Sequence, residues 1–337
     1  MSESAGKTSR AAEVAANVAG ATERRRGQSI REPLSPGAYV EYSVDDQPGV
    51  VERARAYLAG APCEPVAPRR AATVMLVSEG KPHYRRFESP LAGGAPIEET
   101  VDAAPVDVFM LRRASTMAFT PDAVVFPGGG MDARDVECAV PWAGPSPEQW
   151  ARLMSCTEPE ARGIITAAAR EVFEESGVLL ASAPGGAAPI DERGDHWACE
   201  REAVATRQIS FGEFLRERGL VLRSDLMRLR SHWVTPESEA RRYDTYFFLA
   251  RLPKGQHADG RTSEAVEAAW IAPGEALMRF DAGLLKLVPP TISNLTSIVA
   301  ATSVDEAWNT PFDGHVRPHP VARACGEVVL GCEVSET

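Results

Sequence analysis

The chain has 337 residues, of which 44% are hydrophobic and 25% charged, proportions typical of a soluble globular protein with a substantial core. Its formal net charge of −11 excludes general nucleic-acid binding, which needs a basic surface, and no apolar run approaches the roughly 20 residues that span a bilayer. The six cysteines form no CxxC pair, which favours reduced thiols in a cytoplasmic protein over a disulfide framework or a zinc site.

Composition divides the chain into four parts. Residues 1–35 are rich in Ala, Ser, Glu and Arg without a strong apolar period, so we expect a mobile tail. Residues 36–68 combine a short helix with a Pro-rich linker, since clustered prolines interrupt regular structure. The main folded domain is predicted at residues 69–302, and residues 303–337 form a Pro- and Gly-containing extension.

Hydrophobic periodicity predicts strands mixed with helices along this chain. The expected strands are Ala72–Val77, Val106–Leu111, Val124–Phe126, Val178–Leu180, His232–Val234, Tyr243–Ala250, Ala268–Ile271 and Glu327–Leu330. The expected helices are Gly49–Leu58, Pro147–Leu153, a run that begins near Gly163, residues 196–218, Pro273–Phe280 and Pro289–Val299. This order is compatible with an α/β fold in which helices cover a mixed sheet.

A glycine loop follows the strand Val124–Phe126. Pro127 leads into Gly128, Gly129 and Gly130. Because glycine has no side chain, backbone amides and carbonyls there can approach a ligand or a metal closely. The alternative, a simple tight turn, is compatible with the same role, since a tight turn presents the carbonyls.

An acidic stretch ends the helical run that begins near Gly163. It carries Glu171, Glu174 and Glu175 at positions i, i+3 and i+4, which share one helix face. Carboxylates at this spacing repel one another, and Mg²⁺ or Mn²⁺ would turn that repulsion into coordination. The alternative is a solvated acidic surface, the usual meaning of a charge run.

The glycine loop and the acidic helix together resemble the Nudix box, G-x5-E-x7-R-E-U-x-E-E-x-G-U, where U is a bulky apolar residue. With Gly129 as the first glycine, Asp135 takes the first Glu position, and residues 163–178 fit the second half without a gap. Residues 136–169 stand where the motif has only x7, so we expect an insert at residues 136–162 that loops out beside the active site. The resemblance implies a Nudix-type α/β/α sandwich around a mixed β-sheet.

The same resemblance implies roles for the box residues. The implied ligands of Mg²⁺ or Mn²⁺ are Glu171, Glu174, Glu175 and the backbone carbonyl of Gly128. Glu174 is either an additional ligand or the group that holds a metal-bound water. Arg170 would orient the helix, with Asp135 as its carboxylate partner.

Nudix enzymes place the general base either in the box or on a later loop. Glu264 and Glu267 lie just before the strand Ala268–Ile271, where such a loop carboxylate occurs. We favour Glu264, because residues 260–263 suggest a loop that can close on the site. An ordinary exposed glutamate remains the alternative.

A second segment is similar to the element that precedes the box in coenzyme A diphosphatases, L-L-T-x-R-[SA]-x3-R-x3-G-x3-F-P-G-G. From Arg113 onward the spacing agrees, although Ala118 replaces an Arg and Asp122 a Gly. The substrate-binding residues that this likeness implies are Arg112, Arg113, Gly129 and Gly130. The split box also resembles a peroxisomal branch of these enzymes, but the final residues Ser335–Thr337 do not form its peroxisomal address.

We therefore predict metal-dependent hydrolysis of a diphosphate linkage in a nucleoside diphosphate derivative, with coenzyme A or acyl-coenzyme A ranked first. Dinucleotides or nucleotide sugars are alternative substrates, and a non-catalytic Nudix-fold binding or regulatory module is an alternative function. The expected partner is a small-molecule diphosphate, with neither nucleic acid nor membrane. The sequence is compatible with a homodimer. The expected compartment is the cytoplasm.

Overall fold

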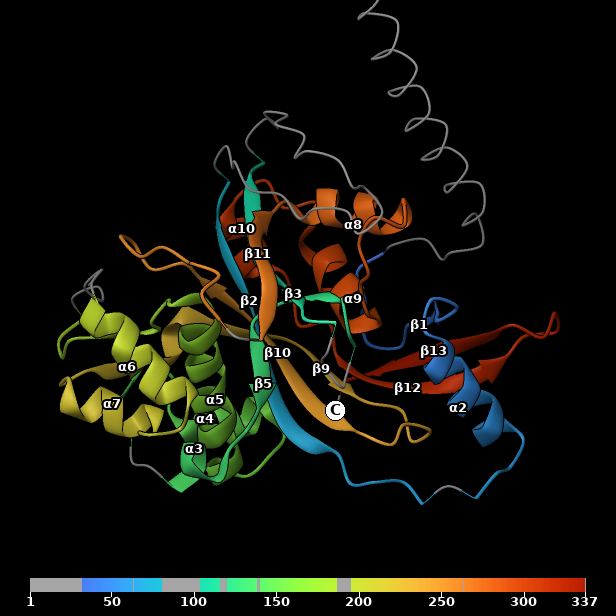
Figure 1. The fold of residues 1–337 in the computed structure, drawn as a ribbon, viewed down its shortest axis with the longest axis horizontal. Helices are drawn as coiled ribbons and strands as arrows, with labels where there is room; N and C mark the ends of the chain where they lie inside the picture. Colours follow the sequence, from blue (N-terminus) through green and yellow to red (C-terminus); the bar gives the residue numbers. More distant parts are fainter. Residues whose placement is uncertain are drawn as a thin grey trace, which may run out of the picture.

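The structure is a computed structural model (Figure 1) that describes most of the chain after residue 31. The described ranges are 32–62, 64–80, 104–115, 120–137, 140–186, 195–262 and 264–336. In these ranges no helix combines the length and the apolar character that crossing a membrane requires.

Strands and helices alternate irregularly along the described residues. The strands are β1 (Tyr39–Ser43), β2 (Arg69–Glu79), β3 (Val106–Arg113), β4 (Val124–Val125), β5 (Gly128–Gly130), β6 (Trp142–Ala143), β7 (Ala181–Ser182), β8 (Val221–Arg223), β9 (Met227–Val234), β10 (Tyr243–Arg251), β11 (Ala265–Ile271), β12 (His315–Ala322) and β13 (Val328–Ser335). The helices are α2 (Pro48–Leu58), α3 (Ala133–Glu137), α4 (Pro147–Met154), α5 (Glu158–Ser176), α6 (Asp195–Ala205), α7 (Phe211–Glu217), α8 (Pro273–Asp281), α9 (Pro289–Ile298) and α10 (Val304–Asn309), with a 3-10 turn η1 at Ser224–Leu226.

One large mixed sheet organises the molecule. Within the described ranges its ten strands run in the order β1-β13-β12-β9-β10-β2-β3-β11, with β4 beside β3 and β5 beside β2. The pairs β10–β2 and β12–β9 are parallel, and the other pairs are antiparallel. A second, small sheet has the order β6-β8-β7.

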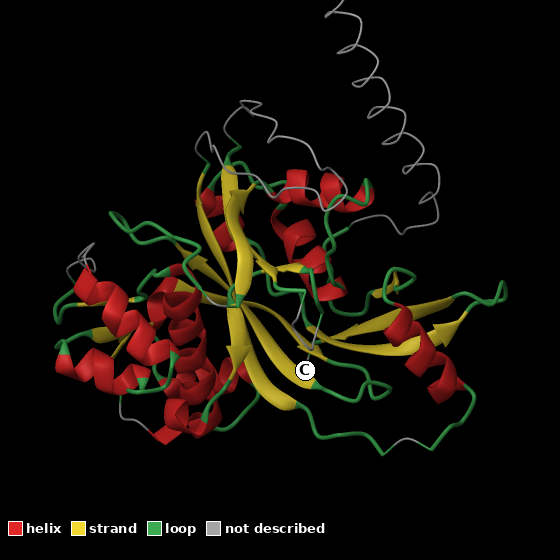
Figure 2. Cartoon of the chain, in the orientation of Figure 1, coloured by secondary structure: helices red, strands yellow, loops and turns green. Residues whose placement is uncertain are grey.

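The large sheet has a hydrophobic core on each face, because side chains of a strand point alternately to its two sides. Along β2, Val74 and Leu76 belong to one core and Met75 and Val77 to the other. Helix α5 packs against β2 in the first core, whereas α8 contacts β3 and α9 contacts β9 on the second. Figure 2 shows the helices gathered on both sides of the strands. The predicted α/β/α sandwich around a mixed sheet is confirmed.

Most predicted elements exist, but their ends differ and some were missed. Residues 178–180 are not a strand, and the expected helical region 196–218 is two helices, α6 and α7. Strands β1 and β12 were not predicted. β12 contains Pro318 and Pro320, which have no backbone N–H to donate. It pairs with β9 only through His315 and Val316. Prolines are tolerated beyond that point, because the side of β12 that faces β9 makes no further strand pairing there.

The segments on either side of residues 69–302 contribute to the large sheet. β1, from the region predicted to hold a helix and linker, pairs with β13 along Tyr39–Ser43. β13 in turn pairs with β12, which reaches β9. Helix α2 packs over β12 and β13 (Figure 1). The division into four parts remains a prediction. The described strands before residue 69 and after residue 302 belong to the same large sheet as strands between these residues.

The contact between β12 and β9 includes two histidines. His315 Nδ1 lies 2.6 Å from His232 Nδ1, and the other ring nitrogen of His232 contacts Asp244. Burial lowers the pKa of His315 to about 4, and the nearby charges of His232 and Arg317 act in the same direction. His315 is therefore neutral in the folded protein near pH 7.

This lowered pKa predicts sensitivity to acid. The folded protein protonates His315 only near pH 4, whereas the unfolded chain does so near pH 6.5. The unfolded state therefore binds more protons in this window, and the stability that His315 contributes is lost as the pH falls from 6.5 to 4. Urea unfolding of the wild type and of His315→Gln should give a difference in unfolding free energy that decreases by on the order of 2–3 kcal/mol across the window. A constant difference would contradict the assignment.

Candidate active site

Helix α5 carries the acidic stretch, and its two ends are fixed by local sequence. At the start, the Thr157 hydroxyl accepts from the Glu160 N–H while the Glu160 carboxylate accepts from the Thr157 N–H, which is a capping box. At the end, Gly177 has φ 73°, in the left-handed region that favours glycine. The helix begins at Glu158 rather than near Gly163, so part of the predicted insert belongs to it.

The glycine segment is a short strand, β5, that pairs with β2 and contacts α5. The Gly128 N–H donates to Glu175 Oε2 at 2.8 Å. A Cβ at Gly129 would stand 2.4 Å from Glu171 Oε1, closer than atoms can approach, so a larger residue would displace that carboxylate. The two halves of the predicted box thus meet in space.

Arg170 links helix α5 to the glycine strand and to Asp135 through hydrogen bonds. It is 7% exposed, and its Nε and Nη2 each donate to Asp135 at 3.0 Å. Nη2 also donates to the Gly130 carbonyl at 2.9 Å. Asp135, on α3, is 3% exposed and makes the bidentate pairing predicted for it despite its shorter side chain. This network joins α3, β5 and α5.

Two of the three glutamates of the box line different hollows. Arg170 Nη1 bonds both Glu171 at 2.7 Å and Glu174 at 3.2 Å, but Glu171 lines the main cavity and Glu174 lines a small separate hollow beside Asp135. A helix turns by about 100° per residue, so Glu174 projects roughly 100° away from Glu175. Glu171 and Glu175, one turn apart, share the side that faces β5.

Buried carboxylates raise one another's pKa here. Burial raises the pKa of Glu171 to about 7 against the opposing charge of Arg170, and the charges of Glu174 and Glu264 add to the rise. Burial and the Glu171 charge raise the pKa of Glu175 well above its usual range, against the Gly128 N–H that bonds it. Perturbed pKa values of this kind in a cleft are typical of functional sites.

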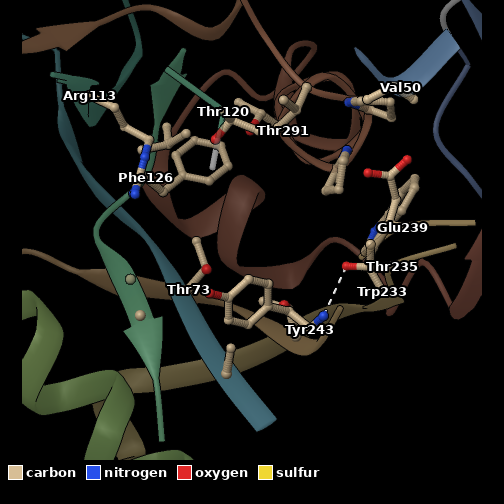
Figure 3. A pocket seen from close by; sticks show the side chains of 18 of the residues that line it. Val50, Thr73, Arg113, Thr120, Phe126, Trp233, Thr235, Glu239, Tyr243 and Thr291 are labelled. Carbon is tan, nitrogen blue, oxygen red and sulfur yellow. Dashed lines mark hydrogen bonds between the residues drawn. The ribbon is translucent and has the colours of Figure 1, made fainter. Parts of the chain in front are cut away.

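A cavity of about 720 Å³ opens beside these residues, a size typical of small-molecule sites. Its walls come from α2, β2, β5, α5, the β9–β10 turn and the start of α9. Figure 3 shows Arg113 and Phe126 on one wall and Trp233, Thr235 and Glu239 on the facing wall. The cavity therefore lies over central strands of the large sheet, and Glu171 is part of its wall.

The predicted substrate residues separate into two groups. Gly129, Gly130 and Arg113 line the cavity. Arg112 is buried and donates to Glu267 at 3.0 Å, and it is not among the lining residues. The alternation of β3 accounts for this, since neighbouring residues of a strand face opposite sides.

Glu264, the favoured general base, also lines the cavity. It is exposed, and its charge raises the pKa of both Glu171 and Glu175, so it lies near them. Glu267 instead pairs with Arg112. The geometry thus keeps Glu264 as the candidate base and gives Glu267 a structural partner.

The two departures from the coenzyme A element have different outcomes. Ala118 lies outside the described residues. Asp122 has φ 60°, in the left-handed region that favours glycine and that Asp tolerates. It is exposed and is not among the residues that line the cavity.

A divalent metal ion needs several oxygen donors placed close together. Among the described residues, no group of three or more His, Cys, Asp or Glu side chains is placed so that it could hold a metal ion. Mg²⁺ is commonly held by one or two carboxylates together with water and substrate phosphates. Glu171 and Glu175, buried and mutually repelling beside the glycine strand, fit that chemistry.

Sequence and structure comparisons agree with this geometry. A family profile described as the NUDT19 Nudix domain matches residues 151–298. The acyl-coenzyme A diphosphatase NUDT19 of Gallus gallus is 30% identical over 282 residues, which cover 71% of this chain and 70% of that protein. The chain belongs to the NUDT19 branch of the Nudix hydrolases. The human acyl-coenzyme A diphosphatase NUDT19 is 27% identical over 273 residues, covering 71% of this chain and 70% of its own length.

A solved Nudix hydrolase shares the fold. The crystal structure of a Nudix hydrolase from Alicyclobacillus acidocaldarius aligns with a TM-score of 0.55 and 26% identity, covering 74% of this chain and 99% of that one. The NUDT19 profile begins at residue 151, after the glycine strand and Asp135. The first half of the Nudix box is therefore assigned here by its contacts with α5.

The Nudix domain also has site residues that the sequence did not indicate. Arg53 on α2, Glu239 in the β9–β10 turn and Lys286 before α9 all line the cavity. They carry no motif and lie far apart in the chain, so only the fold brings them together. In contrast, none of the described residues in 136–162 lines the cavity. In this region, predicted to be an insert, α4 packs on α5.

Proposed function

We propose that this Nudix hydrolase cleaves the diphosphate of acyl-coenzyme A. The observation that carries the proposal is the similarity to acyl-coenzyme A diphosphatases over most of the chain. The cavity supports it, because Glu171 and Glu264 line it together with other polar and apolar residues. The products would be 3′,5′-ADP and the acylated 4′-phosphopantetheine.

The family is typically dependent on a divalent metal, and we propose Mg²⁺ or Mn²⁺ here. Glu171 and Glu175 would hold the ion, with the Gly128 carbonyl as a further oxygen. A bound cation supplies charge neutralisation for the diphosphate and acidifies attacking water. The assignment explains why two repelling carboxylates are kept buried beside each other.

The residues of the chain then have distinct tasks in hydrolysis. Glu264 accepts a proton as the oxygen of water bonds to one phosphorus and the bridging P–O bond breaks. Arg113 donates to a phosphate oxygen, a charge-assisted contact. Arg170 does not touch substrate in this scheme. It holds Glu171 in place through the 2.7 Å bond and so acts as a positioning residue.

Product identification tests the proposal. We expect purified protein with Mg²⁺ or Mn²⁺ to hydrolyse acyl-coenzyme A with a higher kcat/KM than NADH or a nucleotide sugar, and we expect EDTA to abolish turnover. Mass spectrometry should detect 3′,5′-ADP, which distinguishes diphosphate cleavage from loss of the 3′-phosphate. Rapid cleavage of NADH with coenzyme A untouched would overturn the substrate. No cleavage of any diphosphate would favour a binding module.

A further inference from the structure

The walls of the cavity differ in charge at its two sides. Arg113 and Lys286 lie beside the same short segment, since Arg113 N–H donates to the Ala123 carbonyl and Lys286 Nζ to the Pro121 carbonyl at 3.3 Å. Glu239 lies on the opposite wall from Arg113 (Figure 3). A bound molecule therefore meets Arg113 and Lys286 on one side and the Arg53–Glu239 ion pair on the other.

Glu239 has an unused acceptor. The Arg53 Nε and Nη2 atoms donate to Oε2 at 2.9 and 2.5 Å, which leaves Oε1 buried without a hydrogen-bond partner among the described residues. The residue is only 9% exposed, and a buried carboxylate oxygen without a donor costs free energy. The last torsion of a glutamate is soft, so a small rotation presents Oε1 to a donor in the cavity.

The surroundings of Glu239 suit a neutral chain rather than a phosphate. Val50 on α2 and the buried Trp233 on β9 lie on the same side of the cavity (Figure 3). Thr235 and Tyr243 join them, and the Thr235 hydroxyl accepts from the Tyr243 N–H at 3.0 Å. This side thus offers apolar contact and the remaining oxygen of a carboxylate whose charge Arg53 already neutralises. That oxygen can accept a hydrogen bond from an N–H group.

We propose that Glu239 accepts a hydrogen bond from an amide N–H of the pantetheine arm, while Arg113 and Lys286 face the phosphates of the nucleotide half. The substrate is thereby held in one direction across the cavity, with its diphosphate at Glu171. The inference rests on the proposed acyl-coenzyme A substrate. It assigns to α2 and the β9–β10 turn a specificity role that no Nudix motif indicates.

Binding of the two halves of coenzyme A tests this assignment. Titration calorimetry in Mg²⁺ should give a Kd for 4′-phosphopantetheine that is roughly tenfold higher for Glu239→Ala than for the wild type, the loss expected for one hydrogen bond to a charged group. The Kd of 3′,5′-ADP should stay within about twofold. Glu239→Gln keeps the size and one acceptor oxygen, so its Kd for 4′-phosphopantetheine should lie between the two.

A matched control separates substrate contact from loss of an ion pair. Glu41 also accepts two bonds from one arginine, Arg323, but it does not line the cavity. Glu41→Ala should leave both Kd values unchanged. Equal weakening of both halves by Glu239→Ala, or no weakening of 4′-phosphopantetheine, would overturn the inference alone. A wild type that binds neither half and does not hydrolyse acyl-coenzyme A would overturn the proposed function instead.

Discussion

Replacing Glu175 by Gln is expected to lower kcat for acyl-coenzyme A hydrolysis by about 10²–10³-fold, the usual loss when one group that stabilises developing charge is removed. Gln keeps the size of the side chain and an oxygen that can accept from the Gly128 N–H, so only the charge is lost. Because burial raises the pKa of Glu175, its ionised form is disfavoured by the fold. The variant should therefore unfold at the same temperature as the wild type or higher.

Glu158→Gln is the matched control for this substitution. Glu158 lies on the same helix, in its first turn, and bonds Arg162 at the exposed surface. Its replacement should leave kcat within about twofold, since exposed pairs of this kind contribute little. Steady-state kinetics at limiting Mg²⁺ and thermal denaturation provide the two readouts. Undiminished turnover of Glu175→Gln would remove Glu175 from the metal site.

Arg170→Met is expected to decrease the free energy of unfolding by about 3–5 kcal/mol, because it leaves the buried Asp135 carboxylate without its partner. The arginine makes two bonds to Asp135 and one each to Glu171, Glu174 and the Gly130 carbonyl. Turnover should fall as well, since Glu171 and β5 lose their anchor. Urea unfolding with linear extrapolation measures the change.

Two further variants test whether the stranded Asp135 charge causes the loss of stability in Arg170→Met. Arg162→Met removes an exposed pair from the same helix and should cost only about 0.3–0.5 kcal/mol. Adding Asp135→Asn to Arg170→Met removes the stranded charge and should recover part of the stability. If Arg162→Met and Arg170→Met have equal effects, the buried network does not contribute as described.

The local features of the site could be predicted from sequence because they depend on short-range rules. Helical spacing predicted that Glu171 and Glu175 share a side. It also placed Glu174 on that face, whereas in the structure Glu174 lines a different hollow. The pairing of Arg170 with Asp135 followed from motif order despite the residues between them. The glycines were correctly placed near the box helix, although they form a strand and not a loop.

The far wall of the cavity could not be predicted, for a physical reason. Arg53 and Glu239 come together only because α2 packs on β12 and β13, and these strands reach β9 through pairings of long sequence separation. Periodicity and turn chemistry report on neighbours within a few residues. Neither shows that α2, read as part of a linker region, forms part of a substrate cavity.

The pairing of β1 with β13 also bears on how the protein folds during synthesis. Tyr39 lies opposite Glu333. β1 is synthesised early, so it cannot pair with β13 until residues near position 330 have been made. Pairings of such long sequence separation slow folding and leave edges exposed meanwhile. The β2–β10 pair at the centre of the sheet can form first. The cavity wall that α2 provides is then not yet in place. Arrested chains that lack β13 should therefore be unusually prone to capture by chaperones.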